Sequence, residues 1–316
     1  MNRIVGLHDA DHDVMPKKTF PNLALMKIST FHKQLGDQVE WWSPLFGNKY
    51  DIVYSSKIFD YTPVNPQLPK YTIKGGTGYG LYNTLDKHVD ECFPDYSIYP
   101  KCDYAIGYLT RGCPNTCGYC IVPKKEGDIY TYNNWRNIIR SDSKKLVLMD
   151  NNILASQHGI EQLTELADTP YYIDLNQGMD ASLVAPEIAY LFSKLKWILY
   201  IRLSCDTQDD LVPVIEAVKL LERYGVKSYK VFVYLLVTKN IIDAHNRLMY
   251  LKDLGVSVYA QPLRLGKTEV PNRAQKFFAR FVYYKWYKKV SWKQFCQKNN
   301  IDYLNEHCQQ LLEVPQ

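Results

Sequence analysis

Residues 104–120, YAIGYLTRGCPNTCGYC, join a short apolar segment to three cysteines in a C-x3-C-x2-C pattern. The apolar segment predicts a strand, and Cys113, Cys117 and Cys120 follow it on one short loop. Three thiolates can bind three irons of a 4Fe-4S cluster and leave the fourth iron open to a small molecule. A zinc site, which would need a fourth ligand, and three structural thiols are the competing interpretations.

The chain after this loop alternates predicted strands with predicted helices, two of which end at Gly225 and Gly255. Repeated β-α units imply a parallel sheet with right-handed crossovers, either open or curled into a partial barrel. Functional groups are then expected just after the strand ends. The predicted strands are 104–109, 146–149, 172–175, 198–203, 230–236 and 256–260, and the predicted helices are 158–167, 186–195, 210–224 and 241–254.

The first hundred residues predict a separate, small doubly wound α/β unit. A helix over 22–35 lies between strands at 4–8 and 38–42, and a further strand covers 51–59. The segment 71–78 reads as a strand that runs into a glycine turn. The predicted domains are 1–100, 101–266 and an aromatic, basic helical extension over 267–316.

Composition excludes several classes of protein. With 46% hydrophobic and 22% charged residues, the 316-residue chain is expected to be globular. The longest apolar run, 231–237, is too short to span a membrane and the start of the chain has no secretory signal, so we expect a cytoplasmic protein with no membrane partner. Eight cysteines in that setting indicate thiols or metal ligands rather than a disulfide framework.

The cysteine spacing, Tyr119 before the last cysteine and the preceding Arg-Gly-Cys-Pro segment resemble the signature of the radical S-adenosylmethionine (SAM) superfamily. The resemblance implies a 4Fe-4S cluster and SAM as cofactors. It further implies reductive cleavage of SAM to a 5′-deoxyadenosyl radical, which abstracts hydrogen from a substrate. It also implies a partner that supplies electrons, such as flavodoxin or ferredoxin.

The most specific resemblance is to members with a cobalamin-binding-like domain before the radical SAM domain. It is carried by Pro21-Asn22-Leu23 and by the Gly75-Gly76 turn. It implies a small Rossmann-like domain over 1–100, followed by a partial (β/α)6 TIM-type barrel and a helical C-terminal tail. The Asp-x-His-x-x-Gly loop that binds cobalt in those relatives is absent here, so cobalamin itself is not expected.

The resemblance makes the residues after the second predicted barrel strand candidates for SAM binding. Asp150, Asn151 and Asn152 follow this strand, and carboxylate or amide oxygens there could accept hydrogen bonds from the amino group of SAM. Tyr119 is a further candidate for contact with the cofactors. A turn or helix cap is the alternative interpretation of the Asp-Asn-Asn segment.

Polar residues also follow the third and fourth predicted barrel strands. Arg202 could bind the carboxylate of SAM, and a mutually neutralising pair with Asp206 is the alternative. The candidates for contact near the ribose are Asn176, Gln177 and Ser204.

The remaining cysteines do not suggest a second cluster. Cys205 at the end of the fourth strand could donate a hydrogen atom to a substrate radical, or it could be a small packed residue. The others are scattered singly at Cys92, Cys102, Cys296 and Cys308.

The basic tail leaves the substrate open among a small molecule, a peptide and a nucleic acid. Residues 273–293 contain seven Lys or Arg, eight aromatic residues and no acid, so they could follow a phosphate backbone while the rings stack on bases. Alternatively, Phe277, Phe281 and Tyr284 could close a partial barrel. Residues 119–123 are similar to a stretch of methylthiotransferases, whose further cysteines and RNA-binding domain are missing. A non-catalytic iron-sulfur or zinc protein that binds nucleic acid is the rival function.

Overall fold

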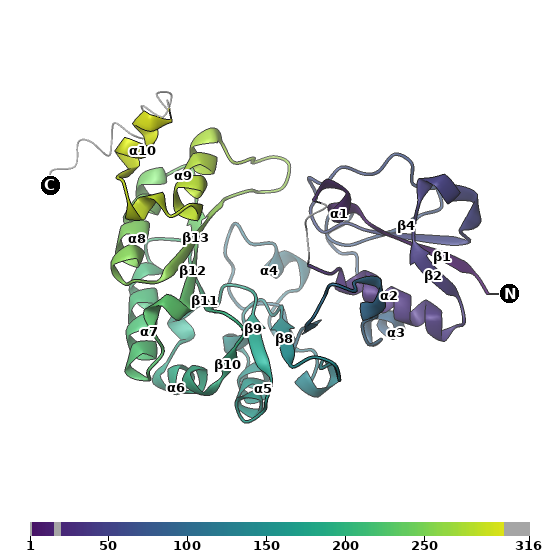
Figure 1. Ribbon diagram of the computed structural model, residues 1–316, viewed down its shortest axis with the longest axis horizontal. Helices are drawn as coiled ribbons and strands as arrows, with labels where there is room; N and C mark the ends of the chain where they lie inside the picture. Colours follow the sequence, from purple (N-terminus) through teal and green to yellow (C-terminus); the bar gives the residue numbers. More distant parts are fainter. Residues whose placement is uncertain (1, 16–19, 300–316) are drawn as a thin grey trace. The chain divides into compact units, whose positions relative to one another are not determined.

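The computed structural model describes residues 2–15 and 20–299 and shows a mixed α/β protein with parallel sheets (Figure 1). This confirms the predicted α/β class. The chain divides into two compact units, Met1–Ile106 and Gly107–Gln316. Residues 300–316, which include Cys308, belong to the predicted tail and lie outside the described residues. Among the described helices, none has both the length and the apolar composition needed to cross a membrane.

The first unit contains a four-stranded parallel sheet in the order β2-β1-β3-β4. The central strand β1 is buried along almost its whole length, and Val5 and Leu7 pack against Leu25 and Ile28 of helix α2. The N-cap of α2 is Asn22, whose side chain accepts a hydrogen bond from the Leu25 N–H. The elements are β1 (Ile4–Asp9), α1 (Ala10–Val14), α2 (Leu23–Gln34), β2 (Gln38–Trp41), β3 (Ile52–Ser56), β4 (Ile73–Gly75) and α3 (Lys87–Asp90).

From β5 onward, two sheets have strands that follow one another in chain order, and β5 itself spans the boundary between the two units after Ile106. One sheet has the order β5-β8-β9-β10 and the other the order β11-β12-β13. A parallel bridge between Met179 and Leu203 joins the segment after β9 to β11. The strands are β5 (Ala105–Gly107), β8 (Lys145–Leu148), β9 (Tyr172–Leu175), β10 (Lys196–Trp197), β11 (Ile201–Cys205), β12 (Val231–Val237) and β13 (Ser257–Pro262).

Four amphipathic helices connect these strands, and the predicted bounds of all four are correct to within one residue. Gly225 and Gly255, which follow two of the helices, have φ values of +86° and +74°, as expected for glycines that end a helix. Each helix turns an apolar face to the core, where Leu163, Phe192 and Leu221 are fully buried. The helices are α5 (Gln157–Ala167), α6 (Pro186–Lys194), α7 (Leu211–Arg223) and α8 (Ile241–Asp253).

Two helices follow β13 in the predicted tail, α9 (Arg273–Tyr283) and α10 (Trp292–Lys298). Helix α9 packs against β13 through a face that includes Phe278 and Phe281. The predicted apolar face of Phe277, Phe281 and Tyr284, which was expected to close the barrel, is therefore wrong, because Tyr284 is 58% exposed. The helix buries Phe278 instead of Tyr284.

Candidate functional site

The three predicted cluster ligands lie on one loop closed by a short hairpin. Strand β6 (Thr110–Arg111) pairs antiparallel with β7 (Tyr130–Thr131), and helix α4 (Val122–Lys125) lies between them. Cys113, Cys117 and Cys120 are all partly buried. Burial raises the pKa of the Cys120 thiol, and the neighbouring thiols of Cys117 and Cys113 raise it further. The Cys120 thiol is thus influenced by both other thiols of the loop.

The loop does not converge on a single metal ion. Among the described residues, no group of three or more His, Cys, Asp or Glu side chains is arranged to hold one. A 4Fe-4S cluster makes a different demand, because each thiolate binds a different iron and the sulfurs surround the cluster instead of meeting at one point. The donor set of the loop, three thiols on eight consecutive residues, is of the kind that such a cluster takes.

The turn before Cys113 requires glycine. Gly112 has a φ of +81°, and a Cβ atom there would lie 2.1 Å from the carbonyl oxygen of Asp128. The Cys113 N–H donates to the Gly127 carbonyl at 3.1 Å. The two ends of the loop therefore meet backbone to backbone, which leaves no room for a side chain at residue 112.

Glu126 holds the base of the loop. Its carboxylate accepts hydrogen bonds from the Arg111 side chain, the Gly112 N–H at 3.0 Å and the Asn151 side chain at 2.9 Å. Burial opposes ionisation of Glu126, but the Arg111 guanidinium outweighs it and holds the pKa below its usual value. Asn151, a predicted cofactor contact, is thus engaged in holding the loop, while Glu126 was not predicted.

Asp150 fixes the chain just before the cluster loop. One carboxylate oxygen accepts hydrogen bonds from the Leu109 N–H at 3.0 Å, the Thr110 N–H at 2.5 Å and the Thr110 hydroxyl at 2.7 Å. Burial raises its pKa to about 6, although these hydrogen bonds favour the charged form. This geometry fits a turn-forming role, the alternative interpretation of the Asp-Asn-Asn segment.

Asn152 stands apart from its neighbours because it has an unpaired oxygen. Its side-chain Nδ2 lies 3.8 Å from the Cys113 sulfur. Its Oδ1 is buried with no hydrogen-bond partner in the described part of the chain, and the residue is only 3% exposed. Buried polar atoms are nearly always paired, so an unpaired acceptor calls for an explanation such as a missing ligand.

Tyr119 connects the cluster loop to the end of β11. Its hydroxyl donates to Asp206 Oδ2 at 3.1 Å. Burial and then the Asp206 carboxylate raise the pKa of Tyr119, so the hydroxyl keeps its proton. Burial also raises the pKa of Asp206. This contact joins residues that are 87 positions apart in the sequence. It ties Tyr119, which lies between Cys117 and Cys120 in the chain, to the residue that follows β11.

Arg202 pairs with a residue that the sequence did not indicate. Its Nε and Nη2 atoms each donate to Asp174 of β9 at 2.7 Å, and Nη1 lies 3.4 Å from the Tyr234 hydroxyl. The expected alternative of a pair with Asp206 is wrong, since Asp174 takes that place. A two-point contact of this kind neutralises the guanidinium in a half-buried position.

The predicted ribose contacts lie at the same strand ends. The Asn176 N–H donates to the Leu148 carbonyl at 2.8 Å, which continues the pairing beyond β9. The Ser204 hydroxyl donates to the Met179 carbonyl at 3.3 Å, and the Gln177 side chain is exposed. The Met179–Leu203 bridge therefore brings the segment after β9 alongside Ser204 of β11, but the structure does not show what these residues bind.

Cys205 lies on the opposite face of β11 from Arg202 and Ser204. It is 0% exposed, and burial raises its pKa to about 11. This position fits the packed alternative more closely than the hydrogen-atom donor.

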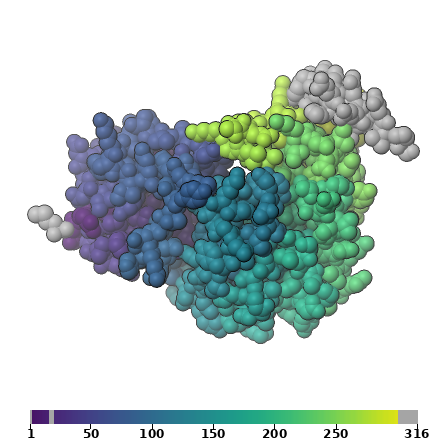
Figure 2. All heavy atoms as spheres, turned by 180° about the vertical axis from the view of Figure 1, so that it is seen from behind, coloured from purple at the N-terminus to yellow at the C-terminus, as the bar shows by residue number. Residues whose placement is uncertain are grey.

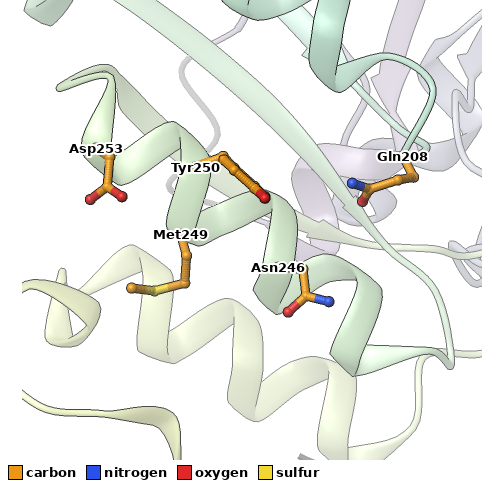
Figure 3. A pocket seen from close by; sticks show the side chains of 5 residues that line it. All are labelled: Gln208, Asn246, Met249, Tyr250 and Asp253. Atoms are coloured by element: carbon orange, nitrogen blue, oxygen red, sulfur yellow. The ribbon is translucent and has the colours of Figure 1, made fainter. Parts of the chain in front are cut away.

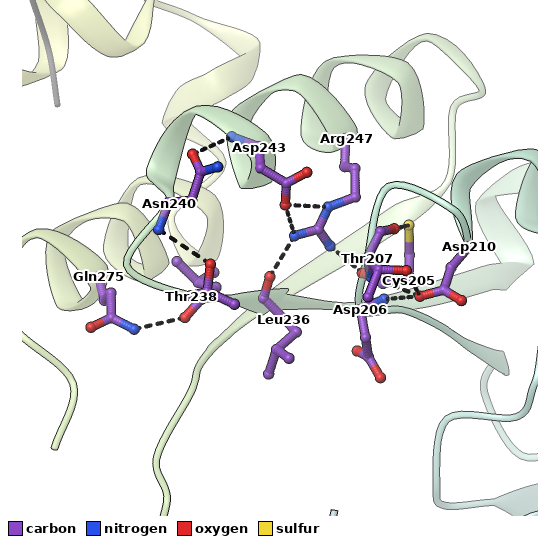
Figure 4. Close-up of polar contacts among 11 residues, drawn as sticks. Cys205, Asp206, Thr207, Asp210, Leu236, Thr238, Asn240, Asp243, Arg247 and Gln275 are labelled. Atoms are coloured by element: carbon purple, nitrogen blue, oxygen red, sulfur yellow. Dashed lines mark hydrogen bonds and ion pairs between the residues drawn. The ribbon is translucent and has the colours of Figure 1, made fainter. Parts of the chain in front are cut away.

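A buried arginine holds the ends of β11 and β12 together (Figure 4). Arg247 of α8 is 0% exposed and donates to the carbonyls of Cys205 and Leu236, the latter at 2.8 Å. Its charge is balanced by Asp243 at 2.7 Å. Arg247 thereby fixes the backbone just before Asp206, the partner of Tyr119. The helical spacing of Asp243 and Arg247 was the one signal of this pair in the sequence.

A surface pocket of about 460 Å³ lies elsewhere in the second unit (Figure 3). It is lined by Gln208, which lies between β11 and α7, and by residues of α8. It contains neither a cysteine nor any predicted site residue, so it adds nothing to the cluster loop. The lining residues of α8 are Asn246, Met249, Tyr250 and Asp253.

Comparison of the sequence with protein-family models and with curated proteins gives no match.

Proposed function

We propose that this chain is a radical SAM enzyme. The proposal rests on one arrangement: three thiols on a single loop whose first turn requires Gly112, with Asn152 and its unpaired, buried Oδ1 beside the first thiol. Cys113, Cys117 and Cys120 would hold the 4Fe-4S cluster. When bound, this cluster supplies the electron that cleaves SAM to methionine and a 5′-deoxyadenosyl radical.

The residues around the loop would bind SAM and position the cluster ligands. The Asn152 Oδ1 would accept a hydrogen bond from the amino group of SAM, which would supply the donor that this oxygen lacks. Asp150 and Glu126 are positioning residues, because they accept hydrogen bonds from the backbone N–H groups of Thr110 and Gly112, just before Cys113. Tyr119 would hold the cluster loop to the end of β11 through its hydrogen bond to Asp206.

The finer fold assignment is part of the same proposal. A Rossmann-like, cobalamin-binding-like domain over 1–100 is supported by the parallel order β2-β1-β3-β4, in which β2 is added on one side of β1 and β3 and β4 on the other. A partial (β/α)6 TIM-type barrel over 101–266 is supported by β5, β8, β9, β11, β12 and β13, which follow one another with helices between them. Cobalamin is not part of the proposal.

Anaerobic reconstitution with iron and sulfide tests the proposal. The enzyme should take up roughly four irons per chain and should release 5′-deoxyadenosine when it is reduced in the presence of SAM. Cys113→Ser should lose both properties, whereas Cys92→Ser, which changes a cysteine of the first unit outside the loop, should keep them. Zinc uptake without SAM cleavage would overturn the proposal and favour the rival, a non-catalytic metal protein.

A further inference from the structure

The C-terminal segment 273–299 carries one sign of charge on its surface. It contains eight Lys or Arg and no Asp or Glu, and all eight basic side chains are exposed. A surface of this kind attracts a polyanion. Figure 2 shows part of this segment, in lime to yellow, at the surface of the second unit. The basic residues are Arg273, Lys276, Arg280, Lys285, Lys288, Lys289, Lys293 and Lys298.

The aromatic residues of the same segment divide into a buried set and an exposed set. Phe278, Phe281, Tyr287, Trp292 and Phe295 form a small core of ring contacts that supports α9 and α10. The exposed set is the stacking cluster, which consists of Tyr283 (64% exposed), Tyr284 (58%) and Trp286 (40%). The core therefore accounts for five of the nine rings, Phe277 is half-buried, and the three rings of the stacking cluster remain exposed.

The turn that carries the stacking cluster is unusual. Lys285, between Tyr284 and Trp286, has a φ of 55°, and it is the only non-glycine residue with a positive φ among the described residues. A left-handed backbone costs a lysine free energy and is found where the surrounding structure requires it. Lys288 and Lys289 follow within one turn, so the exposed rings and the ammonium groups lie on the same short turn.

We propose that this basic aromatic surface, residues 283–293, binds single-stranded nucleic acid. Lysines would contact the phosphates, and the stacking cluster would receive unpaired bases, since every base offers a flat face to an exposed ring. A lipid surface fits less well, because a membrane-bound helix inserts its apolar face and that of α9 is already packed on β13. The bound nucleic acid would also be the substrate of the radical chemistry, and this step rests on the proposed function.

The test uses the anaerobically reconstituted full chain and a fluorescent single-stranded RNA of about 20 nucleotides, long enough for one site. Binding is followed by anisotropy at several salt concentrations. Replacing Tyr283, Tyr284 and Trp286 together by alanine should weaken binding about tenfold or more, whereas replacing all three by phenylalanine should restore it. Loss in both variants would overturn the stacking role, as would no loss in the alanine variant.

The lysines are tested through the dependence of binding on salt. The triple variant Lys288→Gln, Lys289→Gln, Lys293→Gln should reduce the slope of log affinity against log salt by about two. The matched control is Lys219→Gln, Lys227→Gln, Lys230→Gln, three exposed lysines on and after α7, and it should leave the slope unchanged. An equal effect of the two sets would overturn the proposed location.

Further arms identify the ligand and separate this inference from the proposed function. Duplex RNA, inorganic polyphosphate and anionic lipid vesicles should all bind more weakly than the single strand, and equal binding of any of them would overturn the inference. Single-stranded DNA of the same sequence tells whether the sugar matters. Deoxyadenosine formation without RNA is measured in every preparation. SAM cleavage without RNA binding would contradict only this inference, and RNA binding without SAM cleavage would contradict only the proposed function.

Discussion

Within the predicted cofactor set, Asn152 is the residue with a buried side-chain atom that has no hydrogen-bond partner in the described part of the chain. A buried acceptor without a partner costs about 1–3 kcal/mol relative to a paired one. In this protein the residue that carries the unpaired acceptor, Asn152, contacts the Cys113 sulfur. If SAM supplies the missing donor, the chain tolerates the cost because binding recovers it. The alternative, that Asn152 only shapes the turn, does not explain why its buried oxygen has no hydrogen-bond partner.

Asn152→Leu tests this idea because leucine has a similar volume and no acceptor. We expect the KM for SAM to rise about tenfold or more, as for loss of one charge-assisted hydrogen bond, while the free energy of unfolding stays the same or rises. Deoxyadenosine formation and urea denaturation measure the two quantities. Asn22, also 3% exposed but bonded to Ser56 and Leu25, is the control. Asn22→Leu should destabilise, and a SAM KM unchanged in Asn152→Leu would refute the assignment.

Asp150 gives the loop a dependence on pH. Burial raises its pKa to about 6 in the folded chain, above the value of about 3.9 expected when unfolded. The folded state then binds the proton more tightly, so this contribution to stability is complete below pH 4 and is lost as the pH rises through 6. We expect about 3 kcal/mol of stability to disappear over this range. Asp150→Asn should remove that slope in urea titrations at successive pH values, and an unchanged slope would count against the assignment.

At the scale of elements, the cluster loop depends on the close approach of its two ends. Gly112→Ala forces a side chain into a positive φ and into the Asp128 carbonyl. The variant should bind little iron after reconstitution, while its far-ultraviolet circular dichroism stays that of the parent because the sheets are untouched. Gly118→Ala in the same loop is the control, since a Cβ atom there meets nothing within 4 Å. Equal iron content in the two variants would show that the turn is dispensable.

Which elements could be predicted follows from the range of the forces that make them. Helices α5 to α8 follow from periodicity, and the ends of α7 and α8 follow from Gly225 and Gly255; both signals are local in sequence. The Arg202–Asp174 pair and the Glu126 contacts join residues from separate elements, so only the fold reveals them. Tyr284 was assigned to the wrong face of α9 because Phe277, Phe278 and Phe281 allow two helical stripes. The choice between those stripes depends on β13.

At the scale of the whole molecule, the predicted chemistry is concentrated in the second unit. The cysteine loop, Asn152 and the ends of β9 and β11 all belong to residues 107–316. The buried Arg247 adds rigidity there by joining two strand ends to α8, so that Asp206 is held for Tyr119. A cofactor bound at this loop should consequently stabilise the folded state of the unit that holds it.

SAM should stabilise the chain only when the cluster is present. At a SAM concentration about a hundred times its Kd, binding to the folded state alone adds about 2.7 kcal/mol. For a unit of this size that corresponds to a rise in Tm of roughly 5–10 °C. The variant with Cys113, Cys117 and Cys120 all replaced by serine should show no rise, because SAM then lacks the open iron as a partner. Differential scanning calorimetry under anaerobic conditions makes the comparison. If the serine variant is stabilised as much as the parent, SAM binds away from the three cysteines, and the cluster loop is not where this protein holds it.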